Sequence, residues 1–208
     1  MPEHKKKCNC QCQSDNDALK PSVKWSFSLI FILGVIFLAK PFISNQMLNR
    51  ALAYDSYNMH SNTVRQCKKV IALEPENQDA WNLMGNSYKT LGEFENATQT
   101  YHLAIHRDPE NRVALFKMGM IFAMKQKYKR AIPYFDEVRR LGVETNASPM
   151  TDPFPYYLAS LEMLASCYEQ SQRYEKAAKT LNELLEHYPC NERATAKLQS
   201  LKQYQPSL

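Results

Sequence analysis

A repeat of 34 residues limits the possible folds of this chain more than any other feature of its sequence. In the segment 78–111, Gly85 and Ala97 are small enough to let two short helices touch. Tyr88 and Tyr101 can fill the space beside that contact. A helix pair of this size cannot bury its apolar face alone, so the recurrence of the pattern predicts a stack of pairs. The recurring positions are Tyr54, Tyr88 and Phe122; Cys67, Tyr101 and Phe135; Ala97 and Ala131; and Pro75 and Pro109.

Four such units fill most of the chain after residue 43, at 44–77, 78–111, 112–145 and 158–191. The joints between units repeat one turn, in which proline fixes φ and ends a helix while the following Asn can cap the next. This turn reads Glu74-Pro-Glu-Asn77, Asp108-Pro-Glu-Asn111 and Tyr188-Pro-Cys-Asn191. Apolar spacing of three and four predicts two amphipathic helices in each unit. Residues 192–208 carry apolar residues at helical spacing and predict a capping helix with a short tail.

The repeat length, the residue pattern and the joints resemble the tetratricopeptide repeat family over about 150 residues. The resemblance implies an all-α solenoid of about four helix-turn-helix repeats with a C-terminal capping helix. The first unit is divergent, because Arg50 and Thr63 stand where Leu and Ala are usual. A proline-rich insertion follows the third unit at 146–157. Two interpretations of this insertion are open: a surface loop, or a lid whose Phe154 and Tyr156 reach over the binding groove.

In this family the first helices of successive units line a concave groove that holds extended peptides or a helix of a partner. The resemblance implies nine contact positions, which are Asn82, Asn86, Lys89, Phe116, Met120, Met124, Glu162, Ser166 and Glu169. Asn82 and Asn86 are i,i+4 neighbours, so both amides can point the same way and hydrogen-bond a peptide backbone. Phe116 with the two methionines would form an apolar, adaptable centre. The alternative is that Phe116 and Met120 belong to the core and that Asn82 is only solvated.

The chaperone-binding subfamily uses Lys and Arg at groove positions to hold a C-terminal carboxylate. Leu48 and Leu52 in the first unit, and Phe116 and Met120 in the third, occupy positions where that clamp needs polar or basic side chains. The sequence therefore predicts an apolar or mixed ligand.

The N-terminal region predicts a membrane anchor. Residues 1–22 are polar and show no apolar period, which predicts a disordered tail. An uncharged run at 25–39 follows, and Trp25 stands where an interfacial aromatic residue is expected. With snorkelling by Lys40 and added apolar length from the next residues, one transmembrane helix is predicted at 23–43. A cut after Ala39 would place Phe37 where a cleavage site needs a small residue and Pro41 just beyond the cut, which favours an uncleaved signal anchor over a cleaved signal peptide.

The formal net charge of +5 is concentrated at the N-terminus, where residues 1–43 hold six Lys against three acidic residues. Positively charged flanks stay on the cytoplasmic side of a membrane. We therefore expect a cytoplasmic N-terminus and exported repeats, which would be periplasmic in a bacterium. The rest of the chain is nearly neutral, with 20 Lys and Arg against 18 acidic residues, and this argues against a nucleic-acid-binding protein.

The sequence shows no hydrolase, metalloprotease, phosphate-loop or dinucleotide motif. We therefore expect neither an enzyme nor a bound cofactor, and no small-molecule substrate. The candidate metal ligands are Cys8, Cys10 and Cys12, whose thiolates can bind Cu(I) or Zn. The alternative is an unstructured tail with modifiable thiols.

Three hypotheses about function follow from these features. The first is a membrane-anchored protein-interaction scaffold, similar to bacterial inner-membrane repeat proteins that assist envelope assembly, secretion or cytochrome maturation. The second is an organelle-surface receptor with cytosolic repeats. The third is a metal or redox protein that uses the three tail cysteines.

Overall fold

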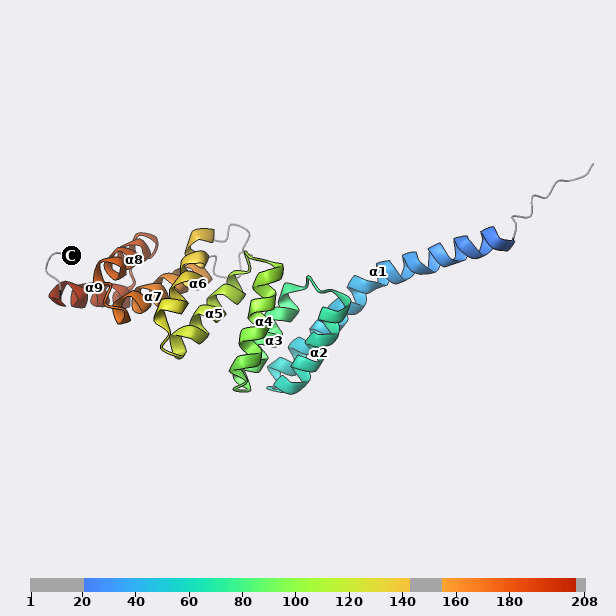
Figure 1. Ribbon diagram of the computed structural model, residues 1–208, viewed down its shortest axis with the longest axis horizontal. Coiled ribbons are helices and arrows are strands. Elements are labelled where there is room, and N and C mark those ends of the chain that lie inside the picture. The colour runs from blue at the N-terminus through green and yellow to red at the C-terminus, as the bar shows by residue number, and fades with distance from the viewer. Residues whose placement is uncertain (1–20, 143–154, 205–208) are drawn as a thin grey trace, which may run out of the picture. The chain divides into compact units, whose positions relative to one another are not determined.

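The structure is a computed structural model that describes residues 21–142 and 155–204, and every described element is an α-helix (Figure 1). The described helices are α1 (Pro21–Ser56), α2 (His60–Leu73), α3 (Gln78–Thr90), α4 (Phe94–Arg107), α5 (Arg112–Met124), α6 (Tyr128–Leu141), α7 (Pro155–Gln170), α8 (Tyr174–His187) and α9 (Glu192–Tyr204). Side chains are described for Gly34, for residues 37–142 and for residues 156–202. In this part of the chain the prediction of an all-α solenoid is confirmed.

The chain divides into two compact units, residues 1–40 and residues 41–208, and the division falls inside α1. The second unit contains the described helix pairs. Its part of α1 packs with α2: Ala51 is fully buried, and the Ser44 hydroxyl donates to a Glu74 carboxylate oxygen at 2.7 Å. Further along, α3 pairs with α4, α5 with α6 and α7 with α8, and α9 packs against α8.

The predicted membrane span at 23–43 lies within α1, which continues past residue 43 to Ser56. Among the described residues, no helix has an apolar stretch long enough to cross a membrane. Most side chains of the predicted span lie outside the described residues, as do residues 1–20.

The proline turns between units end and begin helices as predicted. α4 ends at Arg107, and Asp108 has an extended backbone (φ −132°, ψ 96°) because a residue before proline is kept out of the helical region. Asn111 then caps α5, since its Oδ1 accepts a hydrogen bond from the Ala114 amide at 2.9 Å. The equivalent caps are Asn77 with the Ala80 amide and Asn191 with the Ala194 amide.

The residues at which paired helices touch are matched in size. A Cβ on Gly85 would lie 2.5 Å from the Tyr101 ring, so glycine is needed for this close approach. A Cβ on Gly119 would lie 2.7 Å from the Phe135 ring. In the first and fourth units, alanine replaces the glycine and a side chain smaller than Tyr or Phe replaces the aromatic ring. These pairs are Ala51 with Cys67 and Ala165 with Leu181.

The turns inside the units all contain a residue with positive φ. Only one of these residues is glycine, Gly92, at +78°. The other three, Asn58, Gln126 and Gln172, have φ between 56° and 58°. Non-glycine residues rarely adopt this conformation, so these turns show no sequence signal other than their place in the 34-residue frame.

The fourth helix pair begins earlier than predicted. α7 starts at Pro155, whereas the predicted fourth unit starts at residue 158, and proline is well suited to the first turn of a helix. Tyr156 therefore lies on α7, with its ring edge-on to Phe116 at a centroid distance of 5.6 Å. Phe154 and the rest of the predicted lid lie outside the described residues.

Candidate partner-binding surface

The nine predicted contact residues lie on α3, α5 and α7, which are the first helices of the second, third and fourth units. Met124 is the exposed member, at 59%, and the other eight are partly buried. The members on the first two helices are called the α3–α5 surface: Asn82, Asn86, Lys89, Phe116, Met120 and Met124. The remaining members are called the α7 set: Glu162, Ser166 and Glu169. The two groups differ in how far their polar side chains are bonded within the chain.

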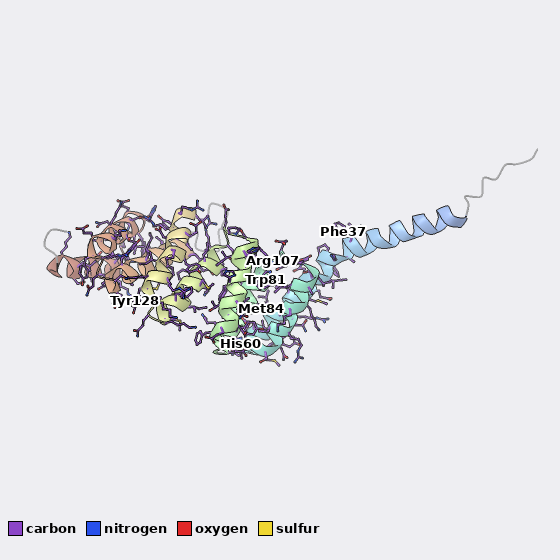
Figure 2. The ribbon with its side chains drawn as sticks, viewed as in Figure 1. Phe37, His60, Trp81, Met84, Arg107 and Tyr128 are labelled. Atoms are coloured by element: carbon purple, nitrogen blue, oxygen red, sulfur yellow. The ribbon has the colours of Figure 1, made fainter. Side chains whose placement is uncertain are left out.

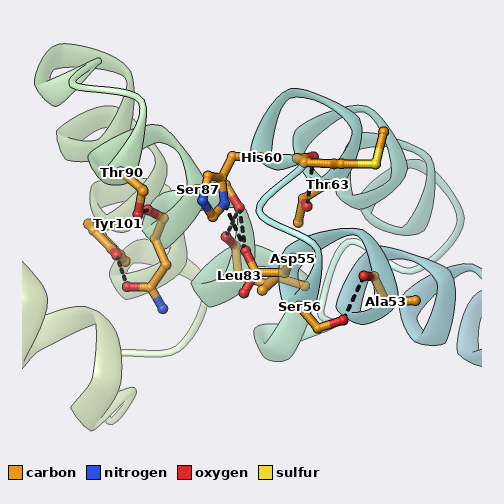
Figure 3. A network of polar contacts seen from close by, with 11 residues as sticks. Ala53, Asp55, Ser56, His60, Thr63, Leu83, Ser87, Thr90 and Tyr101 are labelled. Carbon is orange, nitrogen blue, oxygen red and sulfur yellow. Dashed lines mark hydrogen bonds and ion pairs between the residues drawn. The ribbon is translucent and has the colours of Figure 1, made fainter.

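On α3 the two asparagines have different environments. Asn86 Oδ1 accepts a hydrogen bond from the Tyr101 hydroxyl at 2.9 Å (Figure 3). Burial raises the pKa of Tyr101, so this hydroxyl keeps the proton that it donates. Asn82 Oδ1 is also buried, but it accepts no hydrogen bond from the described residues. A buried acceptor without a partner costs about 1–3 kcal/mol, which a donor from a bound molecule would recover.

A polar network joins α3 to the first unit (Figure 3). Asp55 Oδ1 lies 3.1 Å from His60 Nδ1 and 3.5 Å from the Ser87 hydroxyl oxygen. The Ser87 hydroxyl also lies 2.9 Å from the Leu83 carbonyl oxygen, so its proton is directed at oxygen acceptors and not at the imidazole. The network therefore lacks the serine-to-histidine hydrogen bond of a catalytic triad, and its effect is to hold α3 in position.

The apolar residues of α5 combine packing with exposure. The Phe116 ring lies edge-on to both Phe135 and Tyr156, with centroid distances of 5.6 Å. Met120 packs against the same core cluster. Both side chains remain partly exposed, whereas Met124 at the end of α5 has most of its side chain in solvent. Met124 is thus the apolar contact that is not also needed for packing.

The α7 set is bonded within the chain by α9. Lys197 Nζ lies 2.7 Å from Ser166 Oγ and 2.8 Å from Glu169 Oε2. Asn191 Nδ2 donates to Glu162 Oε1 at 3.1 Å. All three predicted contact residues of α7 therefore already have partners, which narrows the candidate surface to α3 and α5.

Two lysines lie within electrostatic range of each other on α3 and α5. Burial lowers the pKa of Lys117, and the charge of Lys89 lowers it further. Neither amine has a hydrogen-bond or ion-pair partner among the described residues. Lys117 was not among the predicted contact positions, although the 34-residue frame places it at the position that Lys197 holds on α9.

The part of the chain that the structure describes holds no group of three or more His, Cys, Asp or Glu residues able to bind a metal ion. The candidate ligands Cys8, Cys10 and Cys12 lie outside it. Burial raises the pKa of the Cys67 thiol to about 12 and that of Cys167 to about 11, so both are unreactive at neutral pH. Cys190 is exposed.

Packing around the core supports the family resemblance in detail. Trp81 and Met84 are buried where α3 meets its neighbours, and the Arg107 guanidinium lies 5.6 Å from the Trp81 ring centroid (Figure 2). Two family models, both described as Tetratricopeptide repeat, match residues 82–142 and residues 159–189. The helix pairs α3–α4, α5–α6 and α7–α8 are tetratricopeptide repeats.

Solved structures of several other proteins share this fold. MamA from residue 41 onward, from Desulfovibrio magneticus RS-1, is 15% identical with a TM-score of 0.63 over 78% of this chain and 85% of that one. Pseudomonas aeruginosa pilF is 15% identical with a TM-score of 0.64 over 81% and 72%. YrrB, described as a TPR protein with an unusual peptide-binding site, is 17% identical with a TM-score of 0.61 over 77% and 76%. At these identities the likeness shows the fold alone.

Curated relatives match the repeats over part of their own length. Human Tetratricopeptide repeat protein 21B is 28% identical over 126 residues, or 61% of this chain. Human Superkiller complex protein 3 is 21% identical over 150 residues, or 69% of this chain. The matched stretch covers 9% of each relative, so the similarity concerns the repeats and not the whole relatives.

Proposed function

We propose that this chain is a membrane-anchored scaffold for protein–protein interaction whose α3–α5 surface binds a peptide segment or helix of a partner. The observation that carries the binding role is the buried Asn82 Oδ1, which has no hydrogen-bond donor among the described residues. Its position is one at which the family contacts peptides, and a backbone N–H of a bound peptide is a suitable donor. The proposal includes no catalytic step, no nucleic acid and no small-molecule substrate.

The neighbouring side chains suit the same ligand. Asn86 accepts from Tyr101 through Oδ1, which leaves its Nδ2 to donate to a peptide carbonyl. Met124 offers an exposed, flexible apolar contact. The peptide-binding description of YrrB supports a binding role for repeats of this fold.

The proposed anchor is the segment 23–43. Its support is the uncharged run at 25–39, the helical backbone of α1, and the exposure of Phe37 and Leu38 at 74% and 75%. Large apolar side chains exposed together are unfavourable in water and favourable in lipid. We place the N-terminus in the cytoplasm and the repeats on the exported side, with a role in envelope assembly, secretion or cytochrome maturation.

Site-specific crosslinking tests the binding role. A photoreactive amino acid at position 124 at the end of α5 is compared with one at His102, which is exposed on α4, the second helix of the neighbouring repeat. In native membranes we expect a defined partner to crosslink at position 124 and not at position 102. Equal crosslinking at both positions, or none at either, would argue against a binding role for the α3–α5 surface.

Membrane extraction tests the anchor. The proposal predicts that the full-length protein stays in the membrane fraction at alkaline pH. An Ile32→Lys variant, with a charge near the centre of the run, is expected to move to the soluble fraction. A Ser26→Lys variant, with the same charge near the start of the run, is the control and should stay. Extraction of the unmodified protein under these conditions would remove the anchor from the proposal.

Thiol labelling tests the orientation. A membrane-impermeant maleimide should label Cys190 before the inner membrane is permeabilised, because Cys190 is exposed while Cys67 and Cys167 are buried. A Cys190→Ser variant gives the background from the tail cysteines. Labelling of Cys190 only after permeabilisation would support cytosolic repeats, as in the organelle-receptor hypothesis.

A further inference from the structure

Two contacts between helices that lie one repeat apart occupy equivalent places in the 34-residue frame, and we call them the α3–α5 junction and the α7–α9 junction. The α7–α9 junction follows the α3–α5 junction by two 34-residue repeats and the 12-residue insertion. In the first junction, Asn111 caps α5 and donates from Nδ2 to Gln78 Oε1 on α3 at 2.6 Å. In the second, Asn191 caps α9 and donates from Nδ2 to Glu162 on α7. In both junctions the capping Asn therefore bonds the first helix of the preceding repeat, although the acceptors differ in repeat position, because Gln78 corresponds to Leu158 and Glu162 to Asn82.

The α7–α9 junction is neutralised within the chain. Lys197 contacts both Ser166 and Glu169, and the side chains of the ion pair are 27% and 29% exposed. A partly buried amine thus has a carboxylate and a hydroxyl beside it, which offsets the cost of removing its charge from water.

The α3–α5 junction has the same amine but lacks the carboxylate. Lys117 stands at the position of Lys197 and Asn86 at that of Ser166, while Lys89 replaces Glu169. Burial and the charge of Lys89 both disfavour the charged form of Lys117. No described residue neutralises either amine. An added anion would remove the repulsion and offset the cost of desolvation.

We propose that an Asp or Glu side chain of the bound protein partner lies between Lys89 and Lys117 and supplies the negative charge that Glu169 supplies beside Lys197. This inference rests on the proposed function and specifies the chemistry of its ligand. A carboxylate can accept hydrogen bonds from two amines at once, and such charge-assisted bonds are stronger than neutral ones. The internal precedent is a glutamate side chain held by a lysine at 2.8 Å.

The neighbourhood of the two lysines specifies the ligand further. Phe116, Met120 and Met124 keep apolar surface exposed on α5, so we expect apolar residues next to the acidic one. A side-chain carboxylate is favoured over a C-terminal one because Leu48 and Leu52 stand at the first-unit positions where a terminal clamp needs polar groups. The inferred ligand is an acidic and apolar segment inside a partner chain.

The test uses the full-length protein in nanodiscs and a display library of random short peptides with both ends blocked. Selected peptides are made again with each Asp or Glu replaced by Asn or Gln. They are then measured against the unmodified protein and the Lys89→Glu, Lys117→Glu and Lys129→Glu variants. Lys129 is exposed on α6 and gives the same change in net charge, so Lys129→Glu is the matched control. Circular dichroism reports folding, and Lys117→Met replaces Lys117→Glu if that variant does not fold.

We expect selected peptides to be enriched in acidic residues. Loss of the acidic group, or reversal of either lysine, should weaken binding by about tenfold or more. The Lys129→Glu control should bind as the unmodified protein does. Peptides in which Lys replaces the acidic residue should bind the Lys89→Glu variant better than the unmodified protein, because the charges are then complementary again.

Three outcomes would overturn the inference. In the first, peptide binding is weakened by Met124→Arg but shows no acidic preference and no response to Lys89→Glu. This result would support the binding surface and rule out the carboxylate site. Binding only by peptides with a free C-terminus would remove the side-chain assignment. Failure to select any peptide would count against both this inference and the proposed function.

Discussion

The α3–α5 and α7–α9 junctions have the same repeat positions, and they differ in what neutralises their polar residues. In the α7–α9 junction, Lys197 and Asn191 bond all three residues of the α7 set. In the α3–α5 junction, Asn82 Oδ1 and the two lysines have no partner among the described residues. α9 therefore bonds the polar face of the fourth repeat, in addition to covering its apolar face.

This difference also separates the residues of α9 by role. Ala194 and Leu201 are 3% and 1% exposed and cover the apolar core of the fourth repeat. Lys197 lies on the same helix but contacts the polar side chains of α7. The apolar contacts hold α9 in place, and the polar contacts close the junction.

The largest expected effect comes from detaching α9. Leu201→Ala removes a side chain that is 1% exposed and should destabilise the protein by about 2–4 kcal/mol. Chemical denaturation measures this change. Lys202→Ala, at an exposed neighbour, should change stability by less than about 0.5 kcal/mol. Equal effects of the two variants would contradict the role of Leu201 in holding α9 against the fourth repeat.

A second set of variants replaces the contact between Gly85 and Tyr101 in the second repeat by the alanine–leucine contact of the fourth repeat. Gly85→Ala brings a Cβ into the Tyr101 ring and should destabilise by about 1–3 kcal/mol, while displacing the hydroxyl that holds Asn86. Adding Tyr101→Leu copies the Ala165 and Leu181 combination of the fourth repeat and should recover part of the loss. A double-mutant cycle from thermal or denaturant unfolding measures the coupling. Additive effects would show that size matching at this contact is not required.

Reciprocal charge changes should act in opposite directions. Glu169→Lys makes the α7–α9 junction resemble the α3–α5 junction and should cost about 1 kcal/mol, because it breaks a partly buried ion pair. Lys89→Glu supplies the missing carboxylate to Lys117 and should raise stability by about 0.5 kcal/mol. Denaturation midpoints at low and high salt check both variants. A change of the same sign in both would break the correspondence between the junctions.

The smallest expected effect is a pH dependence at Lys117. Its folded-state pKa lies below the ordinary value of 10.5, so between the two values the unfolded chain binds more protons and stability rises with pH. At neutral pH the folded protein bears the whole penalty of the charged amine. Lys117→Met should therefore be more stable than the unmodified protein near pH 7, and this advantage should shrink as the pH approaches 10.5. If the stability advantage of Lys117→Met grew with pH, the pKa of Lys117 would be raised by folding and not lowered.

The fold could be predicted because its determinants are local and repeated. Pro109 and Asn111 specify the end of one helix and the cap of the next, and Gly85 must face the large ring of Tyr101. The positive φ at Gln126 and Gln172 could not be predicted from residue type, since neither is glycine. The sequence predicts a loop or lid up to residue 157, whereas α7 starts at Pro155, because proline is compatible with the first turn of a helix.

The candidate surface could be predicted in part. The nine family positions lie on the first helices of their repeats, but residue type alone could not show that Asn191 and Lys197 bond Glu162, Ser166 and Glu169. It also could not show that Tyr101 uses Asn86 while Asn82 has no donor, because that depends on side-chain positions.

Lysine reactivity in native membranes measures the difference between the two junctions in the unmodified protein. Reductive methylation of each lysine is quantified before and after a high-salt wash, which screens ion pairs and releases a charged partner. We predict that Lys89 and Lys117 are protected before the wash and reactive after it, while Lys197 reacts at the same rate in both samples. Unchanged rates at Lys89 and Lys117, or an equal change at Lys197, would contradict a partner-binding surface at the α3–α5 junction.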